Sequence, residues 1–307
     1  MGNQQLLEQV QGALKSIMTN DLGSSVLARE KRQRFVRVVS EATTILENAR
    51  RIDMQSHTHD IDRVGFASRI LQSASEGEDP SGDPKPSFNT NTLESKEVIA
   101  VPSLTDSTLE DNIEEEGFEN TLIDLIADRT GIDLEEVFLN GDVDSTDEFL
   151  AITDGWLKKA VNKLDGGATE PDFDPADVES MFDAMLSAVP KKYLRNRSEW
   201  TLYVDWDIED DYRNILRERG TGLGDSAQTD AIGLSYKGIS IQDNSNMPSG
   251  TALLVPNSNL VYGVYRDIRI EPERKARQRS TDFVTTLRVD CHYEDENAAV
   301  VAEGYTG

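Results

Sequence analysis

The 307-residue sequence contains a single cysteine, Cys291, so no disulfide can form within the chain. It also lacks an apolar run long enough to span a bilayer, and its first residues do not form the hydrophobic segment of a signal peptide. Among the three histidines, only His57 and His59, followed by Asp60, are spaced for metal chelation along a strand. No cysteine or further histidine lies near them, so we expect a polar strand start there. These absences predict a soluble protein made in a cytoplasm, with no metal and no other cofactor.

Recognisable catalytic motifs are missing as well. The sequence has no Walker loop, zinc-binding pattern or nucleophile elbow. Cys291 and His292 are adjacent in an expected strand, so their side chains point to opposite faces and cannot form a nucleophile–base pair. Residues 142–153 begin like a calcium loop but lack the glycine at its sixth position and the glutamate at its twelfth. The glycine-rich stretch 220–224 follows an expected helix, which argues against a dinucleotide-binding loop. We therefore expect that the protein is not an enzyme.

Positive charge is scarce. The chain has 57 acidic and 31 basic residues, a net charge of -26 and a pI near 4.4. Such a chain repels nucleic acid over most of its surface and repels its own copies at low salt. Molar salt shortens the Debye length to about 3 Å and removes this penalty. The composition favours adaptation to a salty cytoplasm, such as that of a haloarchaeal host, with an ordinary acidic cytosolic protein as the alternative.

The longest amphipathic pattern covers residues 109–142. A capping-box pattern at 107–110 precedes it, Gly117 and Gly131 are candidate breaks, and Gly141 stands where a helix stop belongs. One side of the expected helix is apolar and the other side is densely carboxylated. This predicts a long helix that lies on a sheet with its carboxylated face in water. The apolar residues at helical spacing are Phe118, Leu122, Leu125, Ile126, Leu134, Val137 and Phe138.

The rest of the sequence predicts further helices and strands. A helix is expected from Asp174 and Pro175, with Asp174 as N-cap. A buried strand over 201–206 and a helix over 207–219 follow it. From Ile232 onward the pattern turns to strands. Residues 77–86, rich in glycine and proline, are expected at the tip of a hairpin between 62–72 and an apolar strand at 98–101.

Short motifs then follow in a distinctive order. They are NGD at 140–142, FL at 149–150, DGW at 154–156, YKGI at 236–239 and MPSGTAL at 247–253. A long amphipathic helix followed by these motifs resembles the major capsid proteins of tailed phages, the Hong Kong 97-type shell proteins. The resemblance runs from about Glu41 to the end of the sequence.

The resemblance implies an α+β fold with five successive parts. These are an N-terminal arm at 1–56, an extended β-hairpin loop at 57–97, a peripheral domain with a spine helix at 98–140, an axial domain at 141–258, and closing strands of the peripheral domain at 259–307. A basic run lies in the arm at 29–37 and is a solvated helix face or a contact with a neighbour's carboxylates. No scaffold-like helical region precedes the arm, so we expect no fused scaffolding domain.

The function implied is structural. Copies of the chain would form hexamers and pentamers of an icosahedral virus head around double-stranded DNA, which they would touch only non-specifically. Portal proteins and cement or turret proteins are the further partners implied, with no membrane, and the protein would reside in the virion after synthesis in the host cytoplasm. An encapsulin-like cellular shell with the same fold is the alternative.

One charged segment is a candidate contact between subunits. Residues 271–279 lie between expected strands at 268–270 and 283–289, so we expect a loop there. In the resembling family this loop meets its symmetry mates at threefold junctions, where arginine forks suit carboxylates. A solvated loop, or a basic patch facing packaged DNA, is the alternative. The candidate contact residues are Glu271, Glu273, Arg274, Lys275, Arg277 and Arg279.

Overall fold

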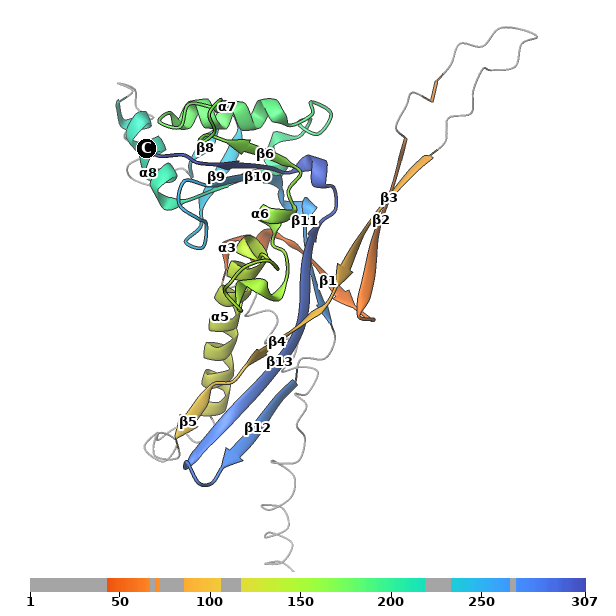
Figure 1. Ribbon diagram of the computed structural model, residues 1–307, viewed down its shortest axis with the longest axis vertical. Helices are drawn as coiled ribbons and strands as arrows, with labels where there is room; N and C mark the ends of the chain where they lie inside the picture. Colours follow the sequence, from red (N-terminus) through yellow and green to blue (C-terminus); the bar gives the residue numbers. More distant parts are fainter. Residues whose placement is uncertain (1–42, 67–69, 72–85, 106–116, 219–232, 266–268) are drawn as a thin grey trace, which may run out of the picture. The chain divides into compact units, whose positions relative to one another are not determined.

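The computed structural model describes residues 43–66, 70–71, 86–105, 117–218, 233–265 and 269–307 (Figure 1). These residues belong to two compact units. The first unit includes 97–132 and 266–288, and the second includes 43–96, 133–265 and 289–307. Helix α5 (Gly117–Asn140) and strand β13 (Ser280–Tyr293) continue from one unit into the other. No helix in these described ranges is long and apolar enough to cross a membrane.

The first unit is built on a β-hairpin. Strand β12 (Arg269–Lys275) pairs antiparallel with β13 from Arg269 opposite Thr286 to Lys275 opposite Ser280. Strands β4 (Lys96–Ala100) and β5 (Ser103–Thr105) also pair with β13. The expected loop at 271–279 is therefore wrong for most of its length. The strand reaches Lys275 and only 276–279 form the turn, because residues 271–275 pair with residues 280–284 of β13.

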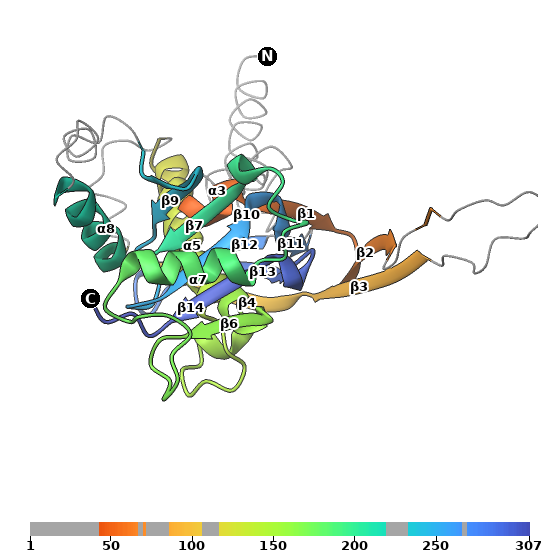
Figure 2. The same ribbon diagram turned by 90° about the horizontal axis from the view of Figure 1, so that it is seen from above.

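The second unit contains a six-stranded sheet in the order β6-β14-β10-β7-β9-β8. Strand β7 (Trp200–Val204) is buried at every position because side chains cover both of its faces. Helices α7 (Val178–Ala188) and α8 (Trp206–Glu218) supply part of that cover (Figure 2). The predicted buried strand and the two flanking helices are thus confirmed. The other strands are β6 (Asn162–Asp165), β8 (Ser235–Tyr236), β9 (Ile239–Asp243), β10 (Ala252–Pro256) and β14 (Val300–Glu303).

Two details of this unit differ from expectation. Helix α7 begins at Val178, and its N-cap is Asp177, whose carboxylate accepts from the Glu179 N–H. Asp174 instead holds the preceding turn by accepting from the Ala176 N–H at 3.1 Å. The final strand β14 also differs, because it pairs with β10 and β6 rather than with the other strands of residues 259–307.

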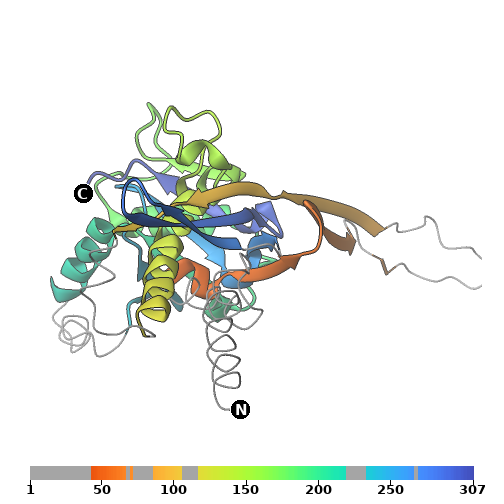
Figure 3. The ribbon, with the colours of Figure 1, turned by 90° about the horizontal axis from the view of Figure 1, so that it is seen from below.

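An antiparallel ribbon leaves the second unit. Strands β2 (Thr58–Phe66) and β3 (Pro86–Glu94) pair over their full lengths, and Figure 3 shows them side by side in orange. A two-stranded extended loop is therefore present, but its second strand is not 98–101 as expected, since β4 pairs with β13. Most of the predicted tip, 77–86, lies outside the described residues.

Part of the expected N-terminal arm is built into the second unit. Strand β1 (Arg50–Met54) pairs in parallel with β11 (Leu260–Tyr265), and a short helix, α3 (Thr44–Asn48), precedes it. Ile45 and Leu46 are fully buried, and Met54 packs in an apolar core with Ile61, Leu93 and Val261. The earlier part of the arm, with its basic run, lies outside the described residues.

Helix α5 is the predicted long helix. Its expected start at 107–110 lies outside the described residues, and Gly131 lies inside the helix without breaking it. Leu134, Val137 and Phe138 are buried as the apolar pattern predicts, but Leu125 is 61% exposed. The helix ends at Asn140, directly before Gly141.

Candidate functional sites

Two glycines form a close backbone crossing directly after α5. The Gly155 N–H donates to the Gly141 carbonyl at 2.8 Å. A Cβ on Gly141 would lie 2.1 Å from the Thr153 carbonyl oxygen, and a Cβ on Gly155 would lie 2.6 Å from the Leu139 carbonyl oxygen. Neither glycine has a positive φ, so close approach and not backbone freedom requires them. The NGD and DGW motifs therefore have a physical cause: the chain recrosses the end of the helix at van der Waals contact.

The loop between these glycines gathers three carboxylates around one ammonium group. Lys158 Nζ lies 2.5 Å from Asp142 Oδ1, 2.7 Å from Asp154 Oδ1 and 3.1 Å from Asp144 Oδ2. Hydrogen bonding to Lys158 lowers the pKa of Asp142, and the same lysine overcomes the effect of burial to lower the pKa of Asp154. In the segment that begins like a calcium loop, the Lys158 ammonium group thus partly balances the charge of the carboxylates.

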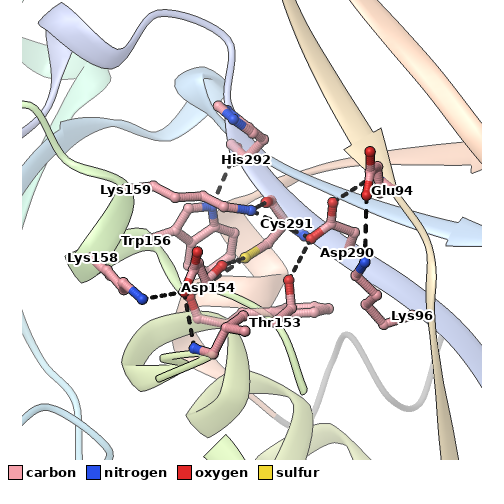
Figure 4. Close-up of polar contacts among 12 residues, drawn as sticks. Glu94, Lys96, Thr153, Asp154, Trp156, Lys158, Lys159, Asp290, Cys291 and His292 are labelled. Atoms are coloured by element: carbon pink, nitrogen blue, oxygen red, sulfur yellow. Dashed lines mark hydrogen bonds and ion pairs between the residues drawn. The ribbon is translucent and has the colours of Figure 1, made fainter. Parts of the chain in front are cut away.

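A buried carboxylate joins several segments of the second unit (Figure 4). Asp290 on β13 is 3% exposed. Its Oδ2 accepts from the Glu94 N–H at 2.7 Å, at the end of the ribbon, and its Oδ1 accepts from Thr153 Oγ1 at 2.8 Å. Its Oδ1 also accepts from the Cys291 N–H and lies 3.4 Å from Lys159 Nζ. One charged side chain therefore connects the ribbon, β13 and the crossing after α5.

A second buried carboxylate comes from α5 itself. Glu135 is 2% exposed, and its Oε2 accepts from the Ile45 and Leu46 N–H groups at 3.0 and 3.3 Å. Its Oε1 accepts from the Asn244 side-chain amide. The carboxylate thereby caps the first turn of α3 from outside that helix.

The side chains of the candidate junction segment lie along the hairpin of the first unit. Glu271, Glu273, Arg277 and Arg279 are exposed, as is Arg274. Arg279 closes the turn with a φ of 48°. Lys275 is half-buried, and its Nζ lies 2.5 Å from Asp282 Oδ2 on the opposite strand. That ion pair lowers the pKa of Asp282 and raises the pKa of Lys275. The structure thus brings the six residues together on one hairpin, where Lys275 forms an ion pair within the subunit.

The adjacent cysteine and histidine of β13 have separate environments. Cys291 Sγ lies 3.6 Å from the carbonyl oxygens of Phe138 and Asp154, and burial raises the pKa of its thiol to about 12. Burial and the nearby Lys159 lower the pKa of His292. The thiol is therefore protonated at neutral pH and serves as a packing group.

The two histidines spaced for chelation lie at the start of the ribbon. His57 of the HTHD stretch lies with its Nδ1 2.8 Å from Ser95 Oγ.

Sequence reasoning missed the buried carboxylates and the lysine. The pattern that places Glu135 between Leu134 and Val137 could have indicated a buried acid on the apolar side of α5. Lys158 follows Asp154 by four residues, a spacing that favours an ion pair in a helical turn. Nothing local marks Asp290, because its donors other than the Cys291 N–H come from distant parts of the chain.

The long helix, the two-stranded ribbon and the two mixed units define a Hong Kong 97-type shell protein. The chain belongs to the phage capsid family, whose model matches residues 23–304. It is 34% identical over 311 residues to a putative prophage capsid protein, YqbE, of Bacillus subtilis strain 168, with 97% of each chain covered.

Solved structures share the fold at low sequence identity. One is the satellite phage P4 procapsid that includes the size determination (Sid) protein, with a TM-score of 0.70, 15% identity and 98% of this chain and 97% of that chain covered. Another is the capsid of an empty GTA particle, with a TM-score of 0.62, 16% identity and coverages of 96% and 97%. The protein is a major capsid shell protein, and the family indicates a structural rather than an enzymatic role.

Proposed function

We propose that this chain assembles into the hexamers and pentamers of an icosahedral virus head that encloses double-stranded DNA. The observation that carries the proposal is the similarity to a procapsid structure over 98% of the chain. Many small contacts suffice for such a shell, since each subunit is held by several neighbours at once. The proposal includes synthesis in a host cytoplasm, a portal and cement or turret proteins as further partners, and only non-specific contact with DNA. The family match favours this virus shell over an encapsulin-like compartment.

Light scattering of the purified protein tests assembly. We expect particles to form as subunit concentration rises in molar salt. Scattering from monomers alone across salt and concentration, with folding confirmed by circular dichroism, would contradict the proposal. Nuclease-protected double-stranded DNA in particles from the host would separate the virus head from an encapsulin-like shell, which would instead hold a cargo enzyme.

The charged hairpin is proposed as the contact at threefold junctions. Each copy offers exposed arginines to the next copy's exposed glutamates around the ring, and the Lys275–Asp282 ion pair keeps the hairpin in shape. One exposed ion pair contributes ~0.2–1 kcal/mol, so three around a junction contribute roughly 0.6–3 kcal/mol. The contribution is small at one junction but is repeated at every junction of the shell.

Charge reversal tests this contact. Arg274→Glu with Arg277→Glu should leave the subunit folded but prevent shell closure, and adding Glu271→Arg with Glu273→Arg should partly restore closure. Arg217→Glu with Lys96→Glu is the matched control, since it changes the net charge equally outside the hairpin. Normal assembly of the Arg274 and Arg277 double variant would show that this hairpin is not the junction.

We also propose that the shell is adapted to high salt, as in a haloarchaeal host. The support is the net charge of -26, which makes whole subunits repel one another when they assemble. The Debye length grows from about 3 Å at 1 M salt to about 30 Å at 0.01 M, so screening weakens as salt falls. Particle yield and melting temperature should both fall with it. Values that stay constant from molar salt to dilute buffer would overturn this proposal.

A further inference from the structure

A basic segment stands out on the second unit. Residues 191–197 carry Lys191, Lys192, Arg195 and Arg197, all exposed, in a chain whose net charge is -26. None of the four forms an ion pair with the described part of the chain, whereas most other described lysines and arginines do. The segment therefore presents unneutralised positive charge.

The backbone of this segment is held in place. The Tyr193 hydroxyl donates to Asp295 Oδ2 at 2.6 Å, and the Trp200 indole N–H donates to the Tyr193 carbonyl at 3.3 Å. Arg197 Nη1 donates to the Lys237 carbonyl at 2.9 Å. Because the segment is already ordered, a partner would bind it at little cost in conformational entropy.

The basic segment lies at one end of strand β7, and acidic residues lie at the other end. The segment precedes this five-residue buried strand, and helix α8 follows it. Figure 1 shows α8 at one end of the sheet, beside the C-terminus. A recess of about 260 Å³ there is lined by Asp207, Asp210 and Asp211, together with Gly250 and Tyr305.

This acidic end also exposes an aromatic ring. The Trp206 side chain is 58% exposed directly before Asp207. The Tyr305 hydroxyl fixes Asp211 by donating to its Oδ2 at 2.9 Å, and no described lysine or arginine pairs with Asp207, Asp210 or Asp211. An exposed indole beside carboxylates suits an arginine, which stacks on the ring while its N–H groups reach the acids.

We propose that the basic segment 191–197 of one subunit binds the Trp206–Asp211 end of the next subunit within a capsomer. The inference rests on the proposed capsomers and names their contact. Two different surfaces at opposite ends of one sheet give a head-to-tail interface, which closes into a ring when it is repeated by rotation. A symmetric contact would have to join both pairs of surfaces at once and would end at a dimer. Because the subunits repel one another overall, attraction between these two surfaces favours the head-to-tail ring over other arrangements.

Charge reversal and exchange test the contact at the lowest salt at which the unaltered protein assembles. Lys191→Glu with Arg195→Glu should raise the subunit concentration needed for capsomers by about tenfold, which corresponds to the loss of two ion pairs and the gain of repulsion. Adding Asp207→Lys with Asp210→Lys should restore assembly. The matched control adds Asp128→Lys with Glu148→Lys instead, which gives the same net charge without restoring the contact. Equal rescue by both pairs would show that only net charge matters and would overturn the proposal.

Engineered disulfides provide an independent test, since the native Cys291 is buried. Lys192→Cys with Asp207→Cys should give a ladder of covalent oligomers up to the hexamer on oxidation, and each single variant should give no efficient cross-link. Efficient dimers from a single variant would indicate a symmetric contact and refute the head-to-tail ring. If the Lys191 and Arg195 double variant forms normal shells with less packaged DNA, the segment is a DNA contact and the proposal fails. Failure of the unaltered protein to assemble at all would count against the proposed function instead.

Discussion

Replacing Asp290 with alanine should destabilise the subunit strongly. The change removes the acceptor of the Glu94 and Cys291 N–H groups and of the Thr153 hydroxyl, and it leaves the Lys159 ammonium without its buried partner. Removing one partner of a buried, hydrogen-bonded charge pair costs about 3–5 kcal/mol. A typical total free energy of unfolding is about 5–15 kcal/mol, so the loss is a large fraction of it.

Urea unfolding of the unassembled subunit measures this change, because assembly would add apparent stability. Asp290→Asn keeps one carbonyl oxygen and should cost less than the alanine variant, about 1–3 kcal/mol for the donor that loses its acceptor. Asp128→Ala, at an exposed position on α5, should change stability by less than about 0.5 kcal/mol. Hydrogen exchange at the Glu94 amide should accelerate in Asp290→Ala. A cost below about 1 kcal/mol with unchanged Glu94 protection would refute the role assigned to this carboxylate.

Two further predictions concern the crossing after α5. Gly155→Ala should lower the free energy of unfolding in urea by about 2–4 kcal/mol, because its Cβ would meet backbone at 2.6 Å and the hydrogen bond to Gly141 would be lost. The control Gly233→Ala, which has open space around it, should be nearly neutral. Equal stabilities of the two variants would contradict the close crossing. Lys158 lowers the pKa of Asp154, so this stabilisation is complete above the usual pKa near 4 and is lost as pH falls through the lower folded value. The difference in free energy of unfolding between Lys158→Met and the unaltered protein should therefore be largest at neutral pH and should shrink as pH falls below about 5. Parallel stability–pH curves for the two proteins would exclude this role.

The sequence was sufficient to predict the elements whose patterns are local. Period-3.6 patterns predicted α5 and the apolar side of α7, and the short stretch 201–206 predicted the buried strand β7. The family motifs predicted the fold, and the glycines within them turn out to mark the tightest backbone contact after the spine helix.

Pairings between distant segments could not be predicted in the same way. A strand at 98–101 matches a ribbon partner by composition, yet β4 bonds to β13, and β14 joins the sheet of β10, because register depends on which edges the folded units leave open. Apart from the Cys291 N–H, the donors to Asp290 lie 131 to 196 residues away, and no local pattern encodes such a set. Residues 271–275 of β12 predict a loop because they contain proline and four charged residues and lack the apolar period of a half-buried strand.

Electron microscopy of the purified protein in multimolar salt tests the central claim most directly. Closed polyhedral particles, whose reconstruction resolves hexamers and pentamers of this chain, are the expected result. A folded protein that remains monomeric, or that forms only open aggregates without sixfold and fivefold units across salt and concentration, would contradict the account.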